Sequence, residues 1–292
     1  MTKVYYVDTA IPSDKKRKGE EKTHAVFDGN RVSRVKKLTK LEDATEIYVD
    51  VIFPQNYEEI MKLIERGIKV FILRNTRLLK RLREEDKIKK SDEADAQLLS
   101  RIPRTFFREL TFREVKLLQL INEYEKYAKW KEIVKIWITK SCSSDPFKEC
   151  VRKLRLIRDS YARRIVKEVI KDEKYAPIYT MVCKELGLRY SVDVAILVVR
   201  LPLNRKLSRL KGLLGLVPHK SKNYHHKLRT HLTRVAATIY LHSKRFNKTE
   251  LKILENIEGL PYRKALYMLQ KRILKILKRA WQQRQCMLAG RQ

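Results

Sequence analysis

The 292-residue sequence predicts an α/β domain followed by two mainly helical parts. Short β-branched, aromatic and apolar runs occur between residues 3 and 73, whereas apolar positions recur at helical spacing from residue 104 onward. The charge changes along the chain as well. Residues 1–100 hold 22 Lys and Arg against 18 Asp and Glu, and residues 101–292 hold 45 against 16. We therefore expect three parts, at 1–103, 104–176 and 177–292.

The first part is expected to begin with a β-hairpin and to continue as strand, helix, strand and helix. Alternating or apolar runs predict strands over residues 3–7, 23–28, 31–38, 46–53 and 68–73. Asp28 and Gly29 are typical of the turn between the second and third strands. Residues 57–66 have amphipathic spacing and end at Gly67, a typical helix C-cap. Ser91 is a suitable N-cap for a helix that begins at Asp92.

Four aspartates that are distant in the sequence occupy related points of these elements. Asp8 ends the first strand, Asp50 lies in the fourth, and Asp92 and Asp95 share a face of the helix that follows the fifth. In an RNase H-like sheet the first and fourth strands are neighbours and that helix crosses their ends. The four carboxylates would then meet, as phosphodiester cleavage with two Mg²⁺ ions about 3.5–4 Å apart requires.

Each acid also has a simpler interpretation. Asp92 and Asp95 are also explained as a capping acid and a solvated surface charge. A carboxylate in a buried strand is costly unless it is paired or bound to a metal. Asp50 therefore gives the strongest support for a site, and the alternative is an edge-strand acid that reaches solvent.

The rest of the chain is predicted to be helical. The pattern over residues 104–174 is interrupted at 141–146, which predicts two long antiparallel helices or, equally, a coiled-coil arm that dimerises. Residues 185–191 have the outline of a helix–hairpin–helix element, whose turn amides and second helix N-terminus can hold a phosphate. Further helices are expected over 227–240 and 262–281.

The net charge of +33 makes a nucleic acid the expected partner. A membrane surface is disfavoured because the basic helices lack a bulky apolar face. The sequence contains no apolar run long enough to span a bilayer and no signal-peptide core, so we expect a soluble, cytoplasmic, nucleoid-associated protein of a prokaryote.

Cysteine and histidine do not form a recognisable metal motif. Cys142, Cys150, Cys183 and Cys286 show no CxxC spacing, so reduced buried thiols are expected, with a Cys142–Cys150 disulfide as the alternative. For the histidines at 225, 226, 231 and 242, nucleic-acid contact or solvation is the expectation.

In sum, these segments resemble the DEDD insertion-sequence transposases that are guided by a bridge RNA. The stretch Lys90 to Ala96 (KSDEADA) is similar to that family's K-T/S-D-x-x-D-A motif. Residues 187–195 resemble its G-I-G segment, and Gly215 to Pro218 (GLVP) resembles its G-L-V-P. Residues 228–237 are similar to its L-R-x-x-L-x-x-A-A helix, and residues 264–274 resemble its final helix.

This resemblance implies a RuvC-like, RNase H-like nuclease domain, a helical coiled-coil linker and a mainly α transposase domain with a nucleophilic serine. It also implies Mg²⁺ or Mn²⁺ at Asp8, Asp50, Asp92 and Asp95, although the family usually has Glu where this chain has Asp50. Only nine residues separate Pro218 from Leu228, and Ser221 is the one serine among them. Ser221 is therefore the candidate nucleophile.

The function expected on this basis is DNA recombination by an insertion-sequence transposase. Its partners would be DNA, a guide RNA and further copies of the chain, as a dimer or tetramer. Alternatives are a structure-specific nuclease for branched DNA and a domesticated, catalytically inactive DNA- or RNA-binding protein. The expected phosphate contacts are Arg189, Arg205, Lys206, Arg209, Lys220, Lys222, Lys227, Arg229, Arg234, Arg263, Lys264, Lys271 and Arg272.

Overall fold

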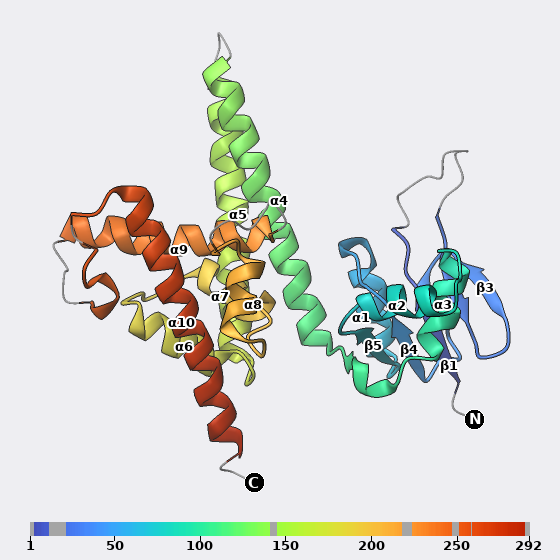
Figure 1. Ribbon diagram of the computed structural model, residues 1–292. Coiled ribbons are helices and arrows are strands. Elements are labelled where there is room, and N and C mark those ends of the chain that lie inside the picture. Colours follow the sequence, from blue (N-terminus) through green and yellow to red (C-terminus); the bar gives the residue numbers. More distant parts are fainter. Residues whose placement is uncertain are drawn as a thin grey trace. The chain divides into compact units, whose positions relative to one another are not determined.

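A computed structural model of the chain describes residues 3–11, 22–140, 145–217, 224–246, 251–257 and 259–289. The chain forms two compact units, Met1–Asn122 and Glu123–Gln292, and the division falls inside the long helix α4 (Phe112–Lys140). The first unit holds a mixed sheet and the second is mostly helical (Figure 1). An α/β domain followed by a helical part is thus confirmed. A separate linker domain at 104–176 stays a prediction.

The first unit is built on one sheet of six strands in the order β3-β2-β1-β4-β5-β6. Strands β1, β4 and β5 are parallel to one another, whereas β2, β3 and β6 join antiparallel. The first and fourth strands are neighbours, as predicted, and the fifth lies inside the sheet between β4 and β6. The strands are β1 (Val4–Asp8), β2 (His24–Phe27), β3 (Val32–Val35), β4 (Glu46–Val49), β5 (Lys69–Leu73) and β6 (Phe107–Glu109).

Several predicted elements differ in extent or were not predicted. The third and fourth strands are shorter than expected, and β4 ends at Val49 because the chain bends at Asp50. Helix α2 (Arg77–Glu85) was not predicted, because Leu79 is its single buried side chain. Strand β6 lies where a helix was expected, and its three residues are too few to give an alternating pattern.

Helices cover both faces of the sheet. On one face, Val7, Ile47 and Val70 pack with side chains of α1 (Tyr57–Glu65) and of the start of α4. On the other face, Tyr48 packs with Leu79 of α2 and with leucines of α3 (Asp92–Ser100). Because successive strand residues point to opposite faces, these two cores place α1 and α3 on opposite sides of the sheet.

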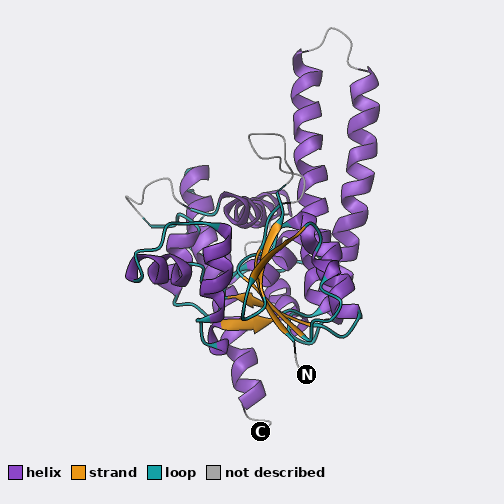
Figure 2. Ribbon diagram, turned by 90° about the vertical axis from the view of Figure 1, so that its right-hand side faces the viewer, coloured by secondary structure: helices purple, strands orange, loops and turns teal. Residues whose placement is uncertain are grey.

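In the second unit, the later part of α4 runs beside α5 (Asp145–Lys171), as both Figure 1 and Figure 2 show. The rings of Tyr127 and Tyr161 stack between the two helices, with centroids 5.6 Å apart. Trp137 and Phe147 meet edge-on nearer the far end of the pair. The two long antiparallel helices were predicted. Dimerisation through them stays a prediction.

The remaining helices form a bundle around α10. Helix α10 packs against α6, α8 and α9, and α7 packs against α9. The chain leaves α6 through Gly187, whose φ of +63° is the left-handed conformation expected for a helix-ending glycine, and Ser191 caps α7. The bounds are α6 (Ala176–Glu185), α7 (Val192–Arg200), α8 (Leu207–Leu213), α9 (His226–Phe246) and α10 (Tyr262–Ala289), with 3₁₀ turns at Leu38–Lys40, Pro54–Asn56, Arg104–Phe106 and Lys252–Leu254.

None of the described helices combines the length and the apolar character that are needed to cross a bilayer.

Candidate functional site

Two of the predicted acids meet at the carboxyl ends of neighbouring parallel strands. Asp8 is the last residue of β1, and Asp50 directly follows β4. Their side chains share a hydrogen bond. Asp50 was predicted to lie within the fourth strand. It lies instead at the tip of β4, one residue beyond the end of the strand. It is half-buried, and the edge-strand alternative is wrong because β4 lies between β1 and β5.

The pair is strongly perturbed electrostatically. Burial, followed by repulsion from Asp50, raises the pKa of Asp8 to about 8, with smaller contributions from Asp92 and Asp95. Burial also raises the pKa of Asp50, although the Thr9 backbone and hydroxyl groups donate hydrogen bonds that favour its charged form. At neutral pH Asp8 therefore carries the shared proton and donates it to Asp50.

The other two acids lie at the start of α3, which packs against β1 and β2. Ser91 caps this helix as predicted, and its hydroxyl accepts a hydrogen bond of 3.1 Å from the Ala94 amide. Asp95 is only 6% exposed and accepts two short hydrogen bonds from Nη1 of Arg83. Asp92 is more exposed and lies 3.4 Å from Nη2 of Arg34, which also binds Glu93.

The four acids therefore form two separate pairs, Asp8 with Asp50 and Asp92 with Asp95. Within the part of the chain that the structure describes, no three His, Cys, Asp or Glu side chains are gathered closely enough to hold a metal ion. Asp8 and Asp50 face each other, whereas Asp92 and Asp95 each bind an arginine. The donor set nevertheless consists of carboxylates, the ligands that Mg²⁺ prefers. Burial and then the neighbouring carboxylates both raise the pKa of Asp8, so this edge of the sheet disfavours a charged Asp8.

A buried polar clamp fixes the backbone that follows Asp8. The Ala10 amide donates to Nδ1 of His24 over 3.0 Å, and the Ala10 carbonyl accepts from the amide group of Asn56 over 3.1 Å. His24 and Asn56 are fully buried, and burial lowers the pKa of His24 to about 4, so its ring is neutral. The Thr9 hydroxyl shares its one proton between Oδ1 of Asp50 and the Val51 carbonyl oxygen, which lies 2.6 Å away. No sequence motif connects these residues, so the clamp could not be predicted from the sequence.

The predicted phosphate contacts of the second unit differ in their surroundings. Arg229 donates to the Leu214 carbonyl over 2.8 Å, and Arg272 donates to the carbonyls of Ile253 and Glu255. Lys271 lies over the Tyr267 ring. Lys227 pairs with Glu125 over 3.2 Å, and Arg234 lies 3.9 Å from Asp193. The exposed members are Arg189, Arg205, Lys206, Arg209, Lys227, Arg263 and Lys264.

His231 is not a surface residue, so the expectation of nucleic-acid contact or solvation is wrong for it. It is 2% exposed, with Nδ1 2.6 Å from Asp193 and Nε2 3.3 Å from Glu125. These acids raise the pKa of His231 against the effect of burial, and Arg200 also binds Glu125. The signal that could have found it is the helical spacing of His231 with the buried Leu228 and Val235.

Several predictions fall outside the described residues. Ser221, Lys220 and Lys222 lie there, and so does Cys142. Of the other cysteines, Cys183 is buried as expected, whereas Cys150 and Cys286 are exposed. The catalytic role of Ser221 and a Cys142–Cys150 disulfide therefore stay predictions.

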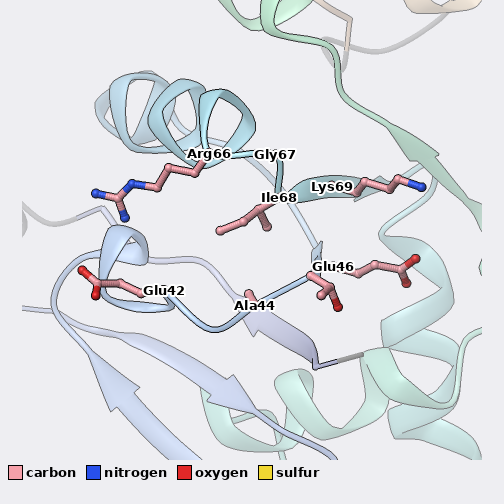
Figure 3. Close-up of a pocket in the computed structure, with 8 residues that line it drawn as sticks. Glu42, Ala44, Glu46, Arg66, Gly67, Ile68 and Lys69 are labelled. Carbon is pink, nitrogen blue, oxygen red and sulfur yellow. The ribbon is translucent and has the colours of Figure 1, made fainter. Parts of the chain in front are cut away.

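A pocket at the opposite edge of the sheet does not suggest a ligand. The volume of this pocket is about 380 Å³, and it lies where β4 and β5 begin (Figure 3). Two acids and two bases line it, so its charges balance. Glu46 already binds the Tyr48 hydroxyl group, and Arg66 binds the Thr39 carbonyl. The charged lining residues are Glu42, Glu46, Arg66 and Lys69.

Comparison of the chain with protein-family models and with curated proteins gives no match in either case.

Proposed function

We propose that this protein cleaves and rejoins DNA phosphodiester bonds at the carboxylate edge of its sheet, as the transposase of an insertion sequence. The observation that carries the proposal is the placement of Asp8 and Asp50 at adjacent strand tips, with Asp92 and Asp95 close enough to raise the pKa of Asp8 further. The other three acids, which come from two further elements, disfavour the charged form of Asp8. A divalent cation would relieve that repulsion.

The ligands proposed for Mg²⁺ or Mn²⁺ are the side chains of Asp8, Asp50, Asp92 and Asp95. Bound ions would activate the attacking oxygen and stabilise the leaving oxygen. The residues of the chain have separate tasks. Asp8 must give up its proton, Thr9 orients Asp50 through two hydrogen bonds to Oδ1, and the Ala10 clamp holds the end of β1 in place.

The strand order and directions support an RNase H-like interpretation of the first unit. Three antiparallel strands lead into two further strands parallel to the first, and a helix carrying two acids follows the fifth strand. The motifs named above add the resemblance to bridge-RNA-guided transposases. A guide RNA, a dimer or tetramer, and attack by Ser221 belong to the proposal on that resemblance alone.

The proposal is tested by strand cleavage of a DNA substrate that carries the ends of the element. Mg²⁺-dependent cleavage should fall at least a hundredfold in Asp8→Asn and Asp95→Asn, because each removes a charged ligand. Asp43→Asn, in an exposed acid that precedes β4, is the matched control and should retain activity. Unchanged cleavage in Asp8→Asn would refute the site. Cleavage that is insensitive to Ser221→Ala would favour the branched-DNA nuclease.

One observation favours a second candidate, an inactive nucleic-acid-binding protein. Asp92 and Asp95 are both paired with arginines, so two proposed ligands are already neutralised. A domesticated protein would keep these pairs permanently. It would bind DNA or RNA without cleaving either one, and Asp8→Asn would not alter that binding.

A further inference from the structure

The positive charge of the first unit is concentrated in one segment, which runs from the end of β5 through α2 to the turn before α3. Residues 74–90 hold eight Lys and Arg against three Asp and Glu, whereas the rest of residues 1–100 hold 14 against 15. The three acids, Glu84, Glu85 and Asp86, are each paired with a lysine or an arginine. The surplus of positive charge is therefore carried by the other cations of the segment.

A groove lies within this basic segment. Helices α2 and α3, which Figure 1 labels, pack against each other, and the groove is at the end of α2 and in the turn between the two helices. Its volume is about 400 Å³. Its charged lining is four basic side chains and one acid. The lining residues are Lys80, Arg83, Glu84, Lys87, Ile88 and Lys90.

The cations of the groove are available to a ligand to different degrees. Arg83 already binds an acid of α3 through Nη1. Lys80 pairs with Glu84 over 3.5 Å, but both side chains are largely exposed, so the pair is weak. Lys87 and Lys90 are exposed, and within the part of the chain that the structure describes their side chains make no hydrogen bond or ion pair. An incoming anion therefore meets two unpaired lysines.

Lys87 has a backbone conformation that lysine seldom adopts. Its φ of 55° lies in the left-handed region. The Lys87 amide donates to the Glu84 carbonyl over 3.4 Å, and the Ile88 amide donates to the Arg83 carbonyl over 3.0 Å. These bonds form the Schellman pattern that ends a helix, in which the left-handed residue is usually a glycine. Unfavourable backbone geometry of this kind is concentrated at functional sites, so the lysine side chain is expected to have a role.

The lining of the groove suits the backbone of a duplex. None of the described side chains that line it is aromatic, so it offers no platform on which unpaired bases could stack. Such platforms are the usual means of holding single strands. A duplex instead presents its phosphates outward, and lysines bind them without contacting the bases. Ile88, which is 40% exposed, adds an apolar contact for a sugar ring.

We propose that this groove is a second contact for duplex DNA, in which Lys87 and Lys90 each bind a phosphate of the backbone. The phosphate contacts expected from the sequence all lie in the second unit, so this surface is additional to them. The inference rests on the proposed function only in taking DNA as the partner, and it requires neither a metal ion nor strand cleavage. Because backbone contacts carry no sequence information, the groove orients the first unit on DNA of any sequence.

The salt dependence of binding tests the proposal, because it reports the number of phosphate contacts. The full-length chain is titrated against a fluorescein-labelled DNA duplex of arbitrary sequence, and the anisotropy is followed between about 50 and 200 mM salt. The double variant Lys87→Gln/Lys90→Gln should reduce the slope of log K against log salt by about 1.8, since each contact contributes about 0.9. Its loss of affinity should be about tenfold greater at the lower salt concentration than at the higher.

The matched control is the double variant Lys40→Gln/Lys62→Gln. Both lysines are exposed and belong to the first unit, but they lie on and beside α1, on the other side of the sheet. The control removes the same charge and should leave the slope unchanged. Lys87→Arg/Lys90→Arg keeps both charges and should bind as the wild type does. A control that reduced the slope as much as the groove variant would overturn the proposal, because only net charge would then matter.

Chemical protection locates the contact on the wild-type chain. Lysines are acetylated with and without the duplex and are quantified by mass spectrometry. The duplex should protect Lys87 and Lys90 but not Lys62. If the duplex binds and leaves Lys87 and Lys90 reactive, the groove is wrong while DNA binding stands. If no duplex binds, both this inference and the proposed function are wrong. An RNA duplex that protects these lysines when the DNA duplex does not would overturn the assignment to DNA.

Discussion

The Asp8 carboxyl group shows how a site residue can destabilise the fold that holds it. Its pKa of about 8 means that the native state holds a proton that the unfolded chain loses near pH 3.8. Stability contributed by this group is therefore greatest below pH 4 and falls as the pH rises toward 8. Without metal, the wild-type protein should lose stability across this interval.

Asp8→Asn should remove that loss. The asparagine amide can donate to Asp50 as the protonated carboxyl group does, without ionising. At pH 8 the variant should be more stable than the wild type by about 2 kcal/mol, less than the full linkage value because Asp8 is only half-buried. Hydrogen exchange of the β1 and β4 amides measures the difference.

The matched control is Asp28→Asn. Asp28 is a turn acid that accepts hydrogen bonds from the amides of Asn30 and Arg31, which lower its pKa. Loss of its charge should therefore weaken the hairpin. If Asp8→Asn were also destabilising at pH 8, the assigned position of the proton would be wrong.

At the scale of elements, His231 joins three helices of the second unit. Its ring on α9 lies between Asp193 of α7 and Glu125 of α4, with Arg200 and Lys227 also facing Glu125 and Arg234 near Asp193. The acids raise the pKa of His231, so its stabilising contribution is complete below about pH 6.5 and is lost as the pH rises through the native pKa.

His231→Gln should lower the protection of α7 and α9 amides by about 2–3 kcal/mol at pH 6, because hydrogen bonds to two charged groups are lost. The difference from wild type should shrink as the pH rises through the raised pKa of His231, because the wild-type ring then loses its charge. His226→Gln, at an exposed position of the same helix, is the control and should show no such trend. A difference that stays constant with pH would contradict a charged His231.

The elements also show what the sequence could predict. Alternating apolar residues and helix caps predicted the positions of β1, α1 and α3 closely, because these signals involve residues that are near in sequence. The Ser91 hydroxyl, for example, accepts a hydrogen bond from the amide of Ala94, three residues later. The adjacency of Asp8 and Asp50 could be anticipated from the strand order. The contacts of Arg83 with Asp95 and of His24 with Ala10 could not be anticipated. They join residues that are brought together by packing, which no local sequence pattern encodes.

For the whole molecule, the net charge of +33 makes the salt dependence of binding a direct test of polyanion recognition. Roughly six to ten phosphate contacts should cost about 10³–10⁵ in DNA affinity between 50 and 200 mM salt, because condensed counterions are released on binding. Fluorescence anisotropy with a duplex measures this slope. A shallow slope would contradict nucleic-acid binding as the role of the basic second unit.

The central claim is that the carboxylate edge of the sheet binds a divalent cation, and calorimetry with Mg²⁺ tests it most directly. Because Asp8 holds a proton at pH 7, binding there should release about one proton, which is measured by repeating the titration in buffers of different ionisation enthalpy. Asp43→Asn should behave as the wild type, and Asp8→Asn should lose both binding and proton release. Mg²⁺ binding that releases no proton, or that persists in Asp8→Asn, would contradict the claim.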